Sequence, residues 1–94
     1  MIDKTTLEKI ESLAEQAKAY FPGATTELEV FPSGSAMLDI RWNGKLFVMD
    51  YSLKYGFAVD EIGTSAGFNT GYRFLSKDFD SAAEELYRLL KAVT

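Results

Sequence analysis

Asn43 and Gly44 form the dipeptide that most constrains how this chain folds. It sits in the middle of residues 36–52, where apolar and polar side chains alternate on both sides of it. An Asn-Gly pair between two alternating runs favours a two-residue type I′ turn, because both positions of that turn need a positive φ. The sequence therefore predicts a β-hairpin in which Trp42 pairs with Lys45.

That pairing sorts the side chains of the hairpin onto two faces of a sheet. One face is apolar or aromatic apart from Lys45 at the rim, and it pairs Ile40 with Phe47, Leu38 with Met49 and Ala36 with Tyr51. The other face is mixed, and it pairs Arg41 with Leu46, Asp39 with Val48 and Met37 with Asp50. Because a strand buries its apolar side, we expect the first face in the core and the second face to be open.

Helices are expected at both ends of the chain. Apolar residues recur at steps of three and four over residues 6–20, where Thr5 and Glu8 fit a capping box. The same spacing predicts a helix over residues 81–92, with Asp78 and Asp80 as candidate caps. Both helices carry a single apolar stripe, so we expect both to pack on the same face of the sheet.

Further strands complete the sheet. Alternation predicts one strand from Thr25 onward and another over residues 57–62, which follow a turn with Gly56 at a positive φ. The pattern does not decide which side of residues 57–62 faces the core. Residues 72–75 are a candidate fifth strand.

These elements predict one α+β domain over residues 1–94, in the order α-β-β-β-β-α. It would be a two-layer sandwich, with an antiparallel meander of four or five strands covered on one face by the N- and C-terminal helices. In architecture and size this plan resembles many small acidic bacterial proteins, including some immunity-type inhibitors.

The chain contains no cysteine and no histidine, which removes several kinds of chemistry. Thiol nucleophiles, the usual neutral-pH base and mixed nitrogen–sulfur zinc sites all need one of these residues. The glycines at 63, 67 and 71 do not match a phosphate-binding loop, since no lysine follows them as that motif requires. We therefore expect no enzymatic activity and no metal or other cofactor.

Charge and hydropathy limit the partners and the compartment. The net charge is −4, and no segment gathers a basic stripe, so we expect neither nucleic-acid binding nor attachment to a membrane. No apolar run resembles a signal peptide or a bilayer-spanning segment. Together with the absence of cysteine, this favours a cytoplasmic location.

Two surfaces remain as candidate binding sites. The first is the open sheet face, represented by Met37, Asp39, Arg41, Leu46 and Val48; an ion pair between Asp39 and Arg41 would explain both charges there. The second is the segment 63–74, whose candidates are Phe68, Tyr72 and Arg73, because tyrosine and arginine are enriched at protein interfaces. The leading hypothesis is a non-enzymatic interaction module that binds another protein or a second copy of itself. The alternative is a small-ligand-binding domain that uses the aromatic residues around Arg73.

Overall fold

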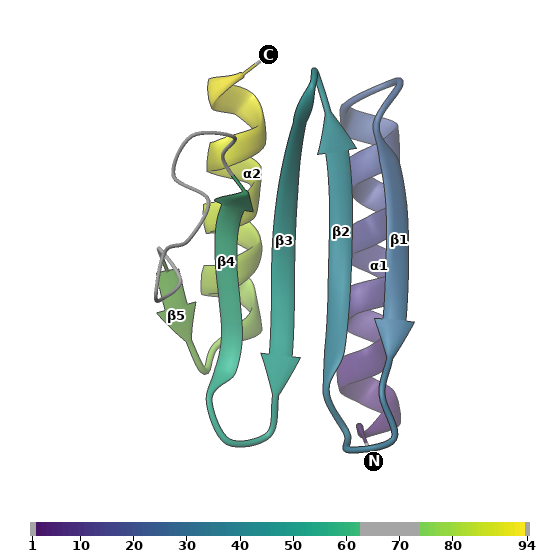
Figure 1. Ribbon diagram of the computed structural model, residues 1–94, viewed down its shortest axis with the longest axis vertical. Helices are drawn as coiled ribbons and strands as arrows, with labels where there is room; N and C mark the ends of the chain where they lie inside the picture. Colours follow the sequence, from purple (N-terminus) through teal and green to yellow (C-terminus); the bar gives the residue numbers. More distant parts are fainter. Residues whose placement is uncertain (1, 63–73, 94) are drawn as a thin grey trace.

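The computed structural model describes residues 2–62 and 74–93 of the chain. The elements follow the order α1 (Lys4–Tyr20), β1 (Thr25–Val30), β2 (Ala36–Trp42), β3 (Lys45–Ser52), β4 (Gly56–Ile62), β5 (Phe74–Ser76) and α2 (Phe79–Ala92). Neighbouring strands pair antiparallel in sheet order β1-β2-β3-β4-β5, a simple meander (Figure 1). The predicted α+β class and element order are confirmed, with the candidate fifth strand present.

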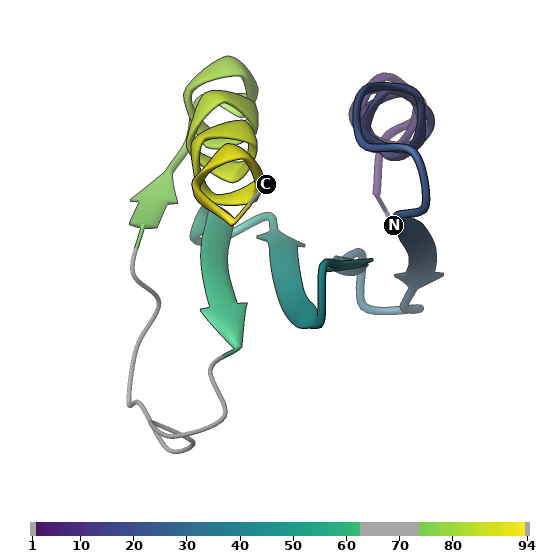
Figure 2. The same ribbon diagram turned by 90° about the horizontal axis from the view of Figure 1, so that it is seen from above.

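Both helices lie on the same side of the sheet, as the single apolar stripe of each predicted (Figure 2). They run in the same direction, α1 over β1 and β2 and α2 over the other half of the sheet (Figure 1). The core between the layers combines helix residues with one face of the strands; its fully buried large side chains are Ile10, Leu38, Ile40, Phe47, Met49, Val59, Leu86 and Leu90.

The hairpin has the register that the Asn-Gly turn predicted. Trp42 pairs with Lys45, and the following pairs are Ile40–Phe47, Leu38–Met49 and Ala36–Tyr51. Asn43 has a φ of 53° and Gly44 a φ of 81°, both in the region that a type I′ turn requires. The core-facing side of this hairpin was therefore predicted correctly from sequence.

The helix starts differ from the sequence prediction. Helix α1 begins at Lys4 with Asp3 as its N-cap, so the expected capping by Thr5 is wrong. The Asp3 side chain accepts hydrogen bonds from the backbone N–H of Thr6 at 3.0 Å and from its hydroxyl at 2.6 Å. Asp78 caps α2 in the same way, while Asp80 lies within the first turn.

Strand β4 settles the question that alternation left open. Phe57 and Val59 face the helices and belong to the core, whereas Ala58 and Asp60 lie on the opposite face. All four are less than 9% exposed, so this strand is buried on both sides and its sequence carries no clear alternation. The short strand β5 pairs with it through Leu75 and Ala58.

The two helix caps make stability depend on acid pH. Hydrogen bonds from Thr6 and Ser81 lower the pKa of Asp3 and Asp78 below the ordinary value of 3.8. The folded protein then binds fewer protons than the unfolded chain, so this contribution is complete above about pH 4 and is lost as pH falls further.

Replacing both caps with asparagine should flatten this pH dependence. Asparagine still accepts the capping hydrogen bond but does not titrate. We expect Asp3→Asn/Asp78→Asn to keep nearly wild-type stability at pH 7 and to lose less of it between pH 5 and pH 2, measured by urea denaturation. An equal loss of stability between pH 5 and pH 2 in the two proteins would contradict this assignment.

Candidate interaction surface

The face of the sheet opposite α1 and α2 carries no helix of the described residues, and we call this surface the helix-free face. Strand pairing brings its side chains together in rows across β1 to β5. One row joins Thr25, Arg41, Leu46 and Ile62, the next joins Glu27, Asp39, Val48 and Asp60, and the third joins Glu29, Met37, Asp50, Ala58 and Leu75. The five sequence candidates on β2 and β3 therefore do share one face, while Phe68, Tyr72 and Arg73 lie outside the described residues.

The middle of the helix-free face is less open than the sequence suggested. Val48 is 6% exposed, and Ala58 and Asp60 are buried to a similar degree. Met37, Asp39 and Leu46 are half-buried, and Arg41 is exposed. Val48 is thus a packed residue, and alternation in a strand says which face a side chain takes but not how well that face is covered.

A hollow opens at one end of the helix-free face, where the β1–β2 and β3–β4 turns lie side by side (Figure 1). It has a volume of about 490 Å³. Its exposed rim consists of Phe31, Tyr55 and Leu75, which are 37%, 57% and 57% exposed. Met37, Asp50 and Ala58 of the third row also line it. We call this feature the turn-end hollow.

Several local contacts position the rim of the hollow. The backbone N–H of Phe31 donates to the carbonyl of Ser35 at 2.9 Å and so holds Phe31 at the end of the β1–β2 ladder. The backbone N–H of Tyr55 donates to the Ser52 hydroxyl at 3.0 Å within the β3–β4 turn. Leu75 is fixed by its pairing with Ala58. Three segments distant in sequence thus supply one apolar site.

The helix-free face is strongly acidic. Among the described residues, the strand positions on this face carry one base, Arg41, against five acids: Glu27, Glu29, Asp39, Asp50 and Asp60. None of the ion pairs among the described residues joins Asp39 to Arg41, so the ion pair expected between them is wrong. Oδ1 of Asp39 is buried and accepts no hydrogen bond from a described residue. Such a face favours cationic contacts.

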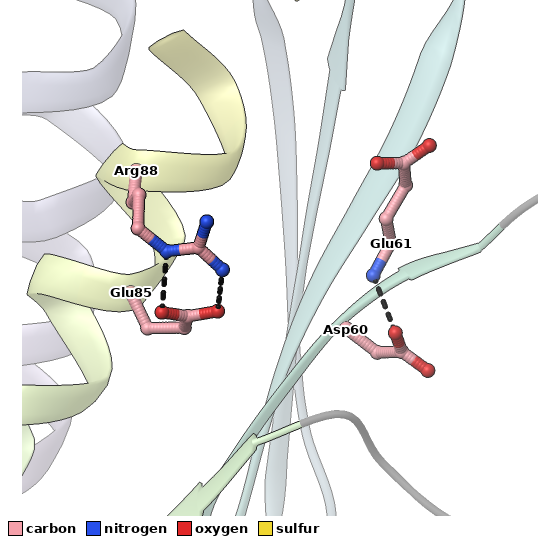
Figure 3. A network of polar contacts seen from close by, with 4 residues as sticks. All are labelled: Asp60, Glu61, Glu85 and Arg88. Carbon is pink, nitrogen blue, oxygen red and sulfur yellow. Dashed lines mark hydrogen bonds and ion pairs between the residues drawn. The ribbon is translucent and has the colours of Figure 1, made fainter. Parts of the chain in front are cut away.

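Asp60 is the buried acid of this face, at 7% exposed. Its Oδ1 accepts a hydrogen bond from the backbone N–H of Glu61 at 2.8 Å (Figure 3). The Glu61 side chain forms an ion pair at 3.4 Å with Lys45 of the neighbouring strand β3. Among residues 2–62 and 74–93, no three acidic side chains gather closely enough to hold a metal ion.

A second hollow, of about 510 Å³, lies between the carboxyl-terminal ends of the two helices. Tyr87 contacts Tyr20 edge-on with ring centroids 6.0 Å apart, and its hydroxyl donates to Gln16 at 3.2 Å. Burial, and then the neighbouring Tyr20, raises the pKa of Tyr87 above 10.0. Arg88 beside it is held by Glu85 at 2.6 Å (Figure 3). The contacts of Tyr87 join the two helices, and the Glu85–Arg88 pair lies within α2, so these contacts have a structural role.

None of the helices in the described part of the chain combines the length and apolar character needed to cross a bilayer. Comparison with known proteins gives no relative: no family model matches the chain, and no curated protein or solved structure is significantly similar to it.

Proposed function

We propose that this protein is a non-enzymatic interaction module that binds another protein through the turn-end hollow of its helix-free face. The observation that carries the proposal is the exposed rim of Phe31, Tyr55 and Leu75 around an apolar depression. Contiguous exposed apolar surface usually marks a contact site, and aromatic side chains supply much of the energy at such sites. The absence of cysteine and histidine favours binding over catalysis and a reducing, cytoplasmic compartment.

The surroundings of the hollow favour a particular kind of partner surface. Asp50 lines the hollow, and Glu29 lies in the same row of the sheet. A partner would therefore insert an apolar side chain between Tyr55 and Leu75 and place basic groups around it. Burying the apolar side chain contributes about 1.5–3 kcal/mol, and the basic groups accelerate association and add specificity.

A small apolar ligand is the second candidate occupant. The hollow, at about 490 Å³, falls within the range of small-molecule sites, about 300–1,000 Å³. This version replaces the ligand site around Arg73 expected from sequence, since Arg73 lies outside the described residues. A ligand at 100 times its Kd would raise the free energy of unfolding by about 2.7 kcal/mol, which a thermal-shift screen detects.

Rim substitutions test the protein-binding proposal. We expect Tyr55→Ala/Leu75→Ser to weaken binding of a partner captured from the lysate of the source organism about 30-fold or more, because truncating interface anchors commonly costs ~2 kcal/mol. Both side chains are more than half exposed, so the fold should persist, checked by circular dichroism and thermal denaturation. Affinity of the purified partner is then measured by calorimetry.

Leu53→Ser is the matched control. Leu53 lies in the same β3–β4 turn and is 85% exposed, but it does not line the hollow. It should leave partner binding unchanged. Equal binding by wild type, the rim variant and the control would overturn the proposal, and a thermal shift from a small molecule that only wild type shows would favour the ligand alternative.

A further inference from the structure

The outer edge of β1 carries backbone groups that no strand of the described residues pairs, since β1 is the first strand in the sheet order. The backbone N–H of Phe31 donates toward β2, to Ser35 at 2.9 Å. Along an antiparallel strand, alternate residues direct their N–H and C=O groups to opposite sides. The residues of β1 that turn their backbone groups outward are therefore Thr26, Leu28 and Val30.

This edge is accessible along most of its length. Val30 is 46% exposed, and Glu27 and Glu29 are exposed, while Leu28 packs partly against the core. Side chains alternate as well, so the two glutamates project on the helix-free face and Leu28 and Val30 project on the helix side. A segment added at this edge would meet acidic groups on one face and apolar groups on the other.

We propose that β1 accepts an extended segment of a partner protein as an additional antiparallel strand, and that this segment alternates basic and apolar residues. Its backbone would pair with Thr26, Leu28 and Val30, which is the usual mode of strand addition at an open sheet edge. Lysine or arginine side chains opposite Glu27 and Glu29 would form cross-strand pairs of opposite charge, and apolar side chains between them would cover Val30.

The same charges disfavour a second copy of the chain at this edge. If β1 paired with its own copy around Leu28, Glu27 would lie directly opposite the Glu29 of the second copy, and a shift by one hydrogen-bonded pair still places two copies of one glutamate opposite each other. Like charges directly opposite are destabilising in a sheet. A cationic segment is thus the occupant that the edge favours.

This inference rests on the proposed function only in that the occupant is a protein, and it uses the edge of β1 rather than the hollow, with Glu29 as the one residue named for both. The probe is a fluorescein-labelled, capped heptapeptide of alternating lysine and valine, and binding is measured by anisotropy at low and physiological salt. We expect saturable binding to wild type and none for the peptide with glutamate in place of lysine. A lysine–valine peptide N-methylated on the residues that pair with β1 keeps its charge and should bind about tenfold or more weakly.

Two variants of the protein locate the site. Thr26→Pro removes one outward N–H without disturbing the hydrogen bonds to β2, a change that edge strands tolerate. It should weaken peptide binding about tenfold. Glu29→Lys should weaken it about fivefold, whereas Glu84→Lys, with the same charge change on an exposed position of α2, should have little effect. Wild type should remain monomeric in sedimentation.

Three outcomes would overturn the inference: equal binding of the N-methylated and unmodified peptides, equal effects of Glu29→Lys and Glu84→Lys, or a dimer of wild type that Thr26→Pro dissociates. The first two would show attraction by net charge alone, and the third a second copy at the edge. The hollow variant Tyr55→Ala/Leu75→Ser should bind the peptide like wild type, so failure of either proposal is recognised separately.

Discussion

Phe47→Ala is expected to remove about 3–5 kcal/mol of folding free energy, the range for truncating a buried phenylalanine. Phe47 lies on β3 beside Ile40 of β2, is 0% exposed and is among the largest fully buried side chains of the core. Its ring fills the space between the sheet and the helices, which have few ways to collapse around the cavity. A domain of this size has a total stability of roughly 5–15 kcal/mol, so this loss is a large fraction of the total.

Urea denaturation followed by circular dichroism measures this effect, with the shift of the midpoint at constant slope as the readout. Leu53→Ala is the control, because the same kind of truncation at an 85% exposed side chain should change stability by less than about 0.5 kcal/mol. Similar losses for the two variants would mean that the register of the hairpin is wrong by one residue, because such a slip moves Phe47 to the opposite face.

The hairpin was predictable because two independent local signals agree. The turn dipeptide fixes which residues pair, and the alternation of side chains fixes which face is buried. In residues 36–52 both give the pairing of Ile40 with Phe47, and that pairing is the one observed. Period-three-and-four spacing likewise identified both helices, because one stripe of each is buried.

The sequence prediction failed where two neighbouring residues could fill the same role, and where packing in the folded protein decides how far a side chain is buried. Asp3 and Thr5 are both good helix caps, and only the path of the chain selects Asp3. The four residues from Phe57 to Asp60 gave no usable alternation because both sides of β4 are buried. Val48 of β3 is likewise buried, so it is a packed residue rather than part of an open surface.

The turn-end hollow was beyond the reach of sequence reasoning for a geometric reason. An open sheet face and a turn before residues 57–62 were expected from sequence, but the proximity of Phe31 and Tyr55 depends on both turns meeting at one end of the sheet. Leu75 joins them only through the β4–β5 register, which no turn signal specifies. A site assembled from three segments requires every strand pairing between them to be known.

Gly56→Ala should destabilise the protein by about 2–5 kcal/mol. Gly56 has a φ of +86°, and a Cβ at this position would lie 2.6 Å from the carbonyl oxygen of Ser76 and 2.9 Å from Cα of Lys77. The left-handed conformation alone costs a residue with a Cβ about 1–2 kcal/mol. The collision adds roughly 1–3 kcal/mol, since it is with backbone, which moves only by displacing β5 from β4.

Gly44→Ala separates these two contributions. Gly44 has nearly the same φ, +81°, but an added Cβ would meet nothing within 4 Å. The Gly44→Ala variant should therefore lose only the free energy of the left-handed conformation, about 1–2 kcal/mol. The difference between the urea midpoints of the two variants then measures the cost of the backbone collision at Gly56. Equal losses at the two glycines would mean that Ser76 does not pack against the start of β4. In that case Leu75 would not be held at the rim of the hollow, and the proposed binding site would lose one of its three sides.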